Sequence, residues 1–185
     1  MGVRKMKIAT RLMSLALVAA ALSGCSSWFE KKQEQPPCPR VSILSDLSRV
    51  THFRPGQGRD LTDVVLQAEF GNYSGSCLYD FKTETMSVKL QVGIDIARGP
   101  AADGRKANLA YFISVPAFYP KPEGKVVMPV EVEFPTNSDR VRYTDNELEV
   151  SIPIKKLRDL AQYEIFLGFQ MDPAEVEYNR SQRVH

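Results

Sequence analysis

The chain has 185 residues, with 24 lysine or arginine side chains, 22 aspartate or glutamate side chains and a formal net charge of +2. Four of the 24 basic residues and no acidic residue lie in the first 24 positions, so residues 25–185 carry 20 basic against 22 acidic side chains. Because this part also lacks a block of lysine and arginine, it does not offer the clustered basic face of a nucleic-acid-binding protein. We predict no nucleic-acid partner.

A positively charged segment opens the chain, and an apolar run from Leu12 to Leu22, interrupted only by Ser14, follows it. This run is too short to cross a bilayer as a helix. A charged segment, a short apolar stretch and small residues before a cleavage point are typical of a secretory signal peptide. We predict that residues 1–24 are such a signal peptide.

The end of this segment, Leu22-Ser23-Gly24-Cys25, resembles the lipobox of bacterial lipoproteins. The resemblance implies that Cys25 is acylated and anchors the mature chain in the lipid bilayer; an ordinary signal peptide followed by a chance cysteine is the alternative. Ser26 follows Cys25, and in lipoproteins of this type a residue other than aspartate there leads to sorting to the outer membrane. We expect a lipid-anchored protein in the cell envelope, at the outer membrane and facing the periplasm.

Residues 25–37 form a polar segment without sustained periodicity, ending in Pro36 and Pro37. We expect a flexible tether between the lipid and a folded domain.

The sequence has three cysteines, and acylation of Cys25 leaves Cys38 and Cys77 as a pair. Export permits a disulfide between them, while two separately buried thiols are the alternative. No further Cys or His cluster completes a zinc site, since His52 and His185 are the only histidines. We predict a disulfide, no bound metal and no cofactor.

From Cys38 onward, apolar and polar residues alternate, most clearly from Met86 to Ile96. A period of two indicates strands with one buried face. The stretches that show it, or that read as short or fully buried strands, are 41–44, 49–53, 64–70, 86–96, 108–115, 130–134, 148–154 and 163–169. About seven to nine strands separated by turns predict an all-β fold, an antiparallel immunoglobulin-like β-sandwich spanning residues 38–172 as a single domain.

The C-terminal segment shows a helix start. Asp172, Pro173 and Glu175 stand at the N-cap, N1 and N3 positions of a capping box. Residues 173–185 are predicted to form a short helix and a tail.

Motifs for catalysis are weak. Residues 71–75, Gly-Asn-Tyr-Ser-Gly, place serine one position too late for a nucleophile elbow, so we interpret them as a turn. Glu131 and Glu133 alternate with apolar residues and are expected to point outward together on a strand. We predict that the protein is not an enzyme.

The most distinctive loop runs from Arg54 to Asp60 and contains two glycines and two arginines. Backbone N–H groups and guanidinium groups can recognise anions. Arg54, Gln57, Arg59, Asp60 and, at the end of the long strand, Arg98 are therefore candidate contacts with a partner or ligand. A structural turn is the alternative for this loop.

Several motifs together resemble a family of uncharacterised cell-envelope lipoproteins of Gram-negative bacteria, along the whole mature chain. The resemblance implies an envelope location but no activity, so no catalytic residue is transferred from it. The motifs are Cys38-Pro39-Arg40-Val41, residues 55–64, Cys77-Leu78-Tyr79-Asp80, Arg98-Gly99-Pro100, Gly168-Phe169-Gln170 and Tyr178-Asn179-Arg180.

Two functions are compatible with these observations. The first is a membrane-anchored, non-enzymatic binding, scaffolding or assembly module that holds an envelope protein partner by its sandwich loops or by an exposed strand edge. The second is a cell-wall or carbohydrate-active enzyme or binding module. Clustered carboxylates with raised pKa in a cleft would favour the enzyme.

Overall fold

The computed structural model describes residues 33–56 and 58–182. The predicted signal peptide, the lipobox with Cys25 and the candidate contact residue Gln57 lie outside the described residues. Gln35–His185 clusters as one compact unit. Its strands and helix are β1 (Val41–Ile43), β2 (Arg49–Phe53), β3 (Val64–Asp80), β4 (Thr85–Arg98), β5 (Lys106–Ser114), β6 (Lys125–Glu133), β7 (Arg140–Pro153), β8 (Ile165–Phe169) and α2 (Pro173–Ser181).

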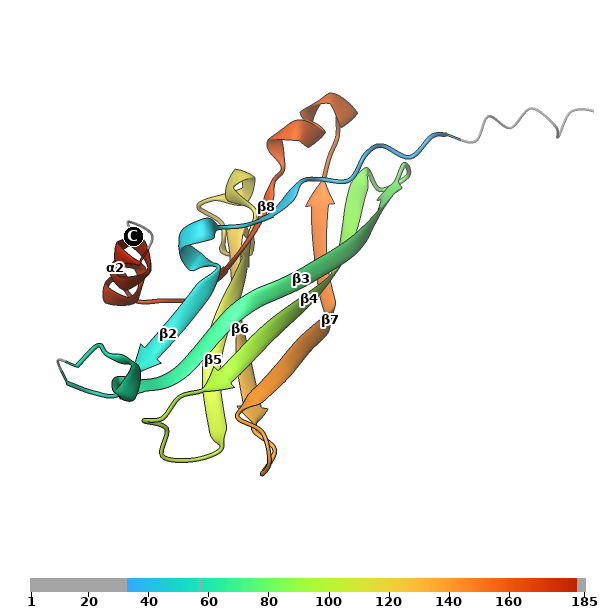
Figure 1. Cartoon of the computed structure of the whole chain (residues 1–185). Helices are drawn as coiled ribbons and strands as arrows, with labels where there is room; N and C mark the ends of the chain where they lie inside the picture. Colours follow the sequence, from blue (N-terminus) through green and yellow to red (C-terminus); the bar gives the residue numbers. More distant parts are fainter. Residues whose placement is uncertain (1–32, 57, 183–185) are drawn as a thin grey trace, which may run out of the picture. The chain divides into compact units, whose positions relative to one another are not determined.

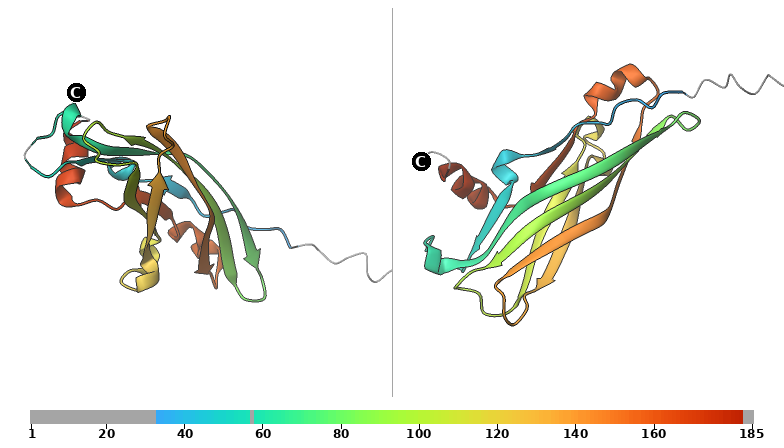
Figure 2. Two further views of the ribbon diagram at one scale, coloured as in Figure 1. Left: turned by 90° about the horizontal axis from the view of Figure 1, so that it is seen from below. Right: turned by 45° about the vertical axis from the view of Figure 1, so that its right-hand side comes forward.

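The strands form two four-stranded sheets that stack as the layers of a β-sandwich, which Figure 1 and Figure 2 show from three sides. One sheet has the order β1-β8-β5-β6 and the other β2-β3-β4-β7. The predicted all-β sandwich with a short C-terminal helix is confirmed. One strand pair differs from the antiparallel pattern, because β1 runs parallel to β8. This pair joins strands from opposite ends of the sandwich sequence.

Alternation along the strands builds the core between the sheets. On β4, Met86, Val88, Leu90, Ile94 and Ile96 are all at most 3% exposed. Their partners come from the inner faces of both sheets, so the two layers share one hydrophobic core. Short 3-10 helices connect the strands, at Ser45–Leu47, Leu61–Asp63, Pro116–Phe118, Pro122–Gly124 and Leu157–Gln162.

The interpretation of residues 71–75 as a turn is wrong, because they continue strand β3. The register of β3 against β4 shifts between Phe70 and Tyr73, which marks a β-bulge. A Cβ atom on Gly75 would lie 2.8 Å from the carbonyl oxygen of Lys89 on β4. This glycine therefore permits a close approach of two strands, and it does not reverse the chain.

One side of the sandwich, which we call the closed side, is covered by the chain itself. The segment from β1 to β2 crosses from one sheet to the other, and its amide at Leu44 donates to Leu167 O on β8 at 2.9 Å. Helix α2 then covers the edge of β2. Asn179 on α2 is 5% exposed, and its Nδ2 donates to Asp46 O at 2.9 Å and to Arg49 O at 2.8 Å.

The predicted capping box starts α2. Glu175 N donates to Asp172 Oδ1 at 2.8 Å, and Asp172 N donates to Glu175 Oε2 at 2.9 Å. The ring of Tyr178 packs edge-on against Phe53, with centroids 5.0 Å apart. The helix is therefore part of the same packed unit as the sandwich.

The chain enters the sandwich beside the far end of β3, an end that we call the tether end. Cys38 and Cys77 lie at disulfide distance, with Cα atoms 5.7 Å apart, as the cysteine count predicted. Gln35 adds a second attachment, since its Nε2 donates to Tyr79 O at 3.2 Å and its Oε1 accepts from Tyr79 N at 2.8 Å. The last residues of the predicted tether therefore belong to the folded unit.

Candidate functional site

The predicted contact loop lies between β2 and β3, at the end of the sandwich opposite the tether end (Figure 1). Arg54 turns back onto Asp63, whose side chain is 4% exposed, with Nε 2.5 Å from Oδ1. Among the described residues no donor reaches Oδ1 with hydrogen-bond geometry, so this contact is an ion pair. A Cβ atom on Gly58 would overlap the Asp63 carboxylate. Glycine at this position lets the loop close over the buried acid.

Arg59 and Asp60 also bond within the loop. Arg59 Nη1 donates to Gly58 O at 2.7 Å and Gly56 O at 3.1 Å. The Thr62 hydroxyl and the Thr62 amide donate to Asp60 Oδ1, which lowers the pKa of this carboxyl. Three of the candidate contact residues, Arg54, Arg59 and Asp60, thus serve the structure of their own loop.

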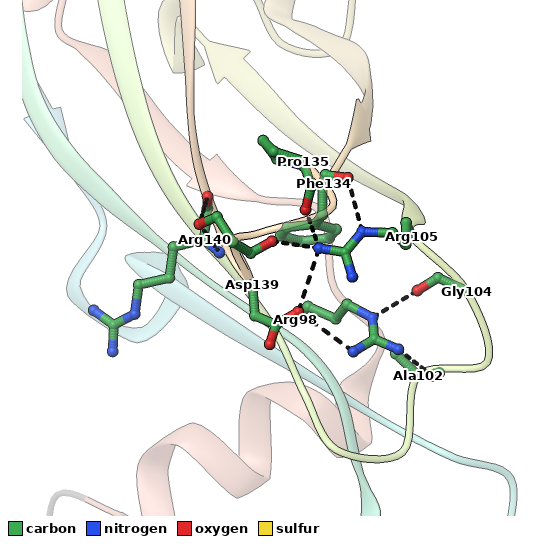
Figure 3. A network of polar contacts seen from close by, with 9 residues as sticks. Arg98, Ala102, Gly104, Arg105, Phe134, Pro135, Asp139 and Arg140 are labelled. Atoms are coloured by element: carbon green, nitrogen blue, oxygen red, sulfur yellow. Dashed lines mark hydrogen bonds and ion pairs between the residues drawn. The ribbon is translucent and has the colours of Figure 1, made fainter.

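Arg98 belongs to a polar network that joins two further loops at this end (Figure 3). Its Nε donates to Gly104 O at 2.7 Å and its Nη2 to Ala102 O at 2.9 Å. Arg105 reaches across to the loop between β6 and β7, donating to Ser138 O at 2.6 Å. Asp139 lies 3.4 Å from Arg98 and 3.7 Å from Arg105. The network orders the two loops, and no motif in the sequence had indicated a role for Arg105.

A row of charges crosses the outer face of the β2-β3-β4-β7 sheet. The residues Arg49, Glu69, Asp95 and Arg142 stand opposite one another on the four strands. Arg142 binds Asp95 through two hydrogen bonds of 2.7 Å, and Arg49 Nη2 lies 3.3 Å from Glu69 Oε1. A shallow depression of about 730 Å³ lies over this row.

Asp95, one of the two carboxylates of this row, is poorly suited to acid catalysis. The hydrogen bonds from Arg142 hold the pKa of Asp95 below its ordinary value, whereas a general acid needs a raised pKa. Each carboxylate of the row also has an arginine partner already. Asp95, with its lowered pKa and its arginine partner, therefore does not fit the raised-pKa acid that would favour an enzyme.

The side of the sandwich opposite the closed side is open, and we call it the open side. Its edges are β6 and β7, which belong to different sheets and form no ladder with each other. Val130 on the inner face of β6 is 1% exposed, but Val126, four residues away on the same face, is 49% exposed. Toward the tether end, inner-face side chains on this side reach solvent.

A groove of about 400 Å³ occupies this opening, and we call it the open-side groove. Of the described residues that line it, all are apolar except a serine and three glutamates, and none is lysine or arginine. The Tyr111 hydroxyl donates to Asp145 Oδ2 at 2.8 Å beside the groove, which joins β5 to β7. Burial raises the pKa of Tyr111, so its hydroxyl stays a donor. The lining residues are Ile113, Val115, Phe118, Glu123, Val126, Met128, Glu147, Leu148, Glu149, Val150 and Ser151.

The open side also differs from the closed side in its strand edges. Pro129 on β6 has no N–H, which limits pairing of a further strand to that edge. Among the strands of the described residues, the tether-end half of β7 pairs only with β4. The outer edge of β7 is therefore the better template for an added strand.

The other titratable groups gather into no further centre within the described ranges. His52 Nε2 lies 3.4 Å from Glu175 Oε1 on α2. In residues 33–56 and 58–182, no three His, Cys, Asp or Glu side chains come together as metal ligands do, and no helix has the length and hydropathy to cross a membrane.

The fold and these surfaces define the protein as a β-sandwich with one closed side and one grooved, open side. Comparison of the chain with family models, with curated proteins and with solved structures found no match.

Proposed function

We propose that the protein is a lipid-anchored, non-enzymatic binding module of the cell envelope that holds a protein partner on its open side. The observation that carries the binding role is the open-side groove, where an apolar floor and three glutamates adjoin an unpaired strand edge. The lipobox sequence ending at Cys25 supports the anchor. The resemblance to bacterial lipoproteins, with Ser26 after Cys25, supports an outer-membrane position facing the periplasm.

The chemistry of the groove indicates the kind of partner. An extended segment laid along β7 would make main-chain hydrogen bonds and would place alternate apolar side chains between the sheets. Lysine or arginine residues in such a segment would face Glu147 and Glu149. The proposed partner is therefore a protein with an extended segment of alternating apolar and basic residues.

The binding role is tested with synthetic peptides on the full mature protein. A peptide of alternating valine and lysine is expected to bind, and a valine–glutamate peptide of equal length is not. Fluorescence anisotropy measures both. The double variant Glu147→Lys, Glu149→Lys should weaken the lysine peptide at least 10-fold, because it removes the charges that attract the peptide. The matched control, Glu131→Lys, alters an exposed glutamate that does not line the groove.

Equal binding of the two peptides would contradict the proposed partner. In cells, a photo-crosslinker placed at Val126 should capture a protein, while one at Glu177 on the closed side should not. The capture supports the proposal only if the double glutamate variant abolishes it.

The anchor has its own test. Radiolabelled palmitate should enter the parent protein and not the Cys25→Ala variant, and the parent should sediment with the outer membrane on a density gradient. Equal labelling of both chains would refute the anchor.

A further inference from the structure

Two large apolar side chains project into solvent at the tether end. Tyr119, in the loop between β5 and β6, is 85% exposed, and Leu157, in the loop between β7 and β8, is 43% exposed. The two loops are neighbours, since the rings of Phe118 and Tyr163 lie 5.9 Å apart. Both loops lie at the end of the sandwich where the chain enters it (Figure 1).

The entering chain lies directly beside one of these loops. Pro36 and Pro37 line a pocket together with Leu157. The disulfide of Cys38 and the hydrogen bonds of Gln35 fix the entry point. The exposed apolar residues and the path toward Cys25 therefore share one end of the domain.

Exposed lysines flank the two apolar residues in their loops. Lys121, Lys155 and Lys156 are exposed, and in the described part of the chain no acidic group forms an ion pair with any of them. The same two loops contain three acidic residues, Glu123, Asp159 and Glu164, and the last two already contact arginines. Asp159 lies 3.7 Å from Arg158, and Glu164 lies 3.7 Å from Arg40.

We propose that Tyr119, Lys121, Lys155, Lys156 and Leu157 form a membrane-contact surface that rests on an anionic lipid bilayer. Tyrosine and leucine suit the interface between headgroups and acyl chains. Each lysine near an anionic surface favours contact by roughly five-fold, and high salt removes this contribution. The surface deepens the proposed function and rests on its lipid anchor.

The short segment between Cys25 and Gln35 keeps the tether end of the domain close to the bilayer. Cys25 lies ten residues before Gln35, a separation that an extended chain spans with at most about 35 Å. From Cys77 to Val64, β3 extends about 40 Å away from the entry point. Contact at the tether end thus leaves the opposite loops facing the aqueous compartment and the open-side groove free at its flank.

The test uses the full mature protein in vesicles of phosphatidylethanolamine and phosphatidylglycerol. An environment-sensitive fluorophore is attached to Tyr119→Cys and, as the matched control, to Leu61→Cys, since Leu61 is 79% exposed at the opposite end. Lipids with spin labels near the headgroup should quench the probe at position 119 and not at position 61. The double variant Lys155→Glu, Lys156→Glu should lower the ratio of contacting to free domain by about 20-fold or more. Lys106→Glu, at the opposite end, should leave it unchanged.

Palmitate labelling of the same preparations separates this inference from the anchor. Quenching at position 119 that is lost in phosphatidylcholine vesicles or at high salt supports the surface. Equal quenching at both positions, or none at 119 in an acylated chain, overturns the surface and leaves the anchor standing. A chain without palmitate overturns both.

Discussion

The closed and open sides are both formed by the edge strands of the two sheets, but the edges are covered on the closed side and exposed on the open side. On the closed side, the chain crosses between the sheets and α2 satisfies exposed backbone groups, with Asn179 donating to two carbonyl oxygens. On the open side, β6 and β7 part toward the tether end and leave an apolar groove. A sheet edge is a site of unwanted pairing unless something covers or interrupts it. The chain covers one side and leaves the other uncovered within the described residues, which supports the proposal of a binding surface on the open side.

The largest loss of stability is expected from Cys77→Ser, which releases the chain leading into the closed side. The bond joins residues 39 positions apart, and the chain-entropy model gives about 4 kcal/mol for a loop of that size. We expect the free energy of unfolding to fall by about 2 to 4 kcal/mol, measured by urea denaturation. Amide exchange should rise first in β1. A variant as stable as the parent, or two alkylatable thiols in the purified parent, would contradict the bond.

Asn179→Ala should cost about 2 kcal/mol, because it leaves two carbonyl oxygens of the closed side without their donor. Glu177→Ala is the matched control, since Glu177 lies on the same helix and is exposed. Alanine is the better helix former, so the control should change stability by less than about 0.5 kcal/mol. Equal effects of the two substitutions would show that α2 does not seal the edge of β2.

The open side can be probed with two valines on the same face of β6. Val130→Ala should cost about 2 kcal/mol, because it removes a buried side chain. Val126→Ala should cost about 0.5 kcal/mol, because that side chain is already half in water. Strand propensity cancels in the comparison, so the difference reports burial alone. Equal losses in thermal or urea unfolding would mean that the sheets close over Val126.

The positions of the strands could be predicted from the sequence better than their pairing and packing. Arg49–Phe53 was predicted with the bounds that the structure has, because apolar alternation is local. The parallel pairing of β1 with β8 is not local, so no pattern indicated it. Residues 71–75 have the composition of a turn, but only the approach of β4 explains Gly75. The sequence shows which residues are small, but it does not show which residues of a neighbouring strand approach them.

The candidate site also depends on contacts between distant parts of the chain, which the sequence does not reveal. The chemistry of Arg54, Arg59 and Arg98 predicts contacts with a partner, and the structure adds that each directs at least one donor to a group of the protein itself. The open-side groove had no sequence signal, because Val126 and Val130 occupy equivalent positions in one alternating pattern. Whether the edges of two sheets pack together or separate depends on contacts between residues far apart in the chain.

The smallest expected effect concerns the ion pair that ties the open edge strand β7 to β4. Hydrogen bonds from Arg142 lower the pKa of Asp95 in the folded protein, so the charged carboxylate stabilises the fold at pH values above the unfolded-state pKa of about 3.9. This stabilisation should be lost as the pH falls through the lower, folded-state pKa. Because the Asp95 side chain is 50% exposed, solvent screening keeps the effect below about 1 kcal/mol.

The measurement is the free energy of unfolding of the parent and of Asp95→Asn between pH 7 and pH 2. The parent should lose more stability than the variant as the pH falls, and added salt should narrow the gap. Glu69→Gln is the matched control on the closed-side pair β2–β3, where Arg49 makes a single contact of 3.3 Å. A smaller difference is expected there, because the Asp95–Arg142 pair has two hydrogen bonds of 2.7 Å. If Asp95→Asn follows the parent at every pH, the pair does not hold the open edge strand in place.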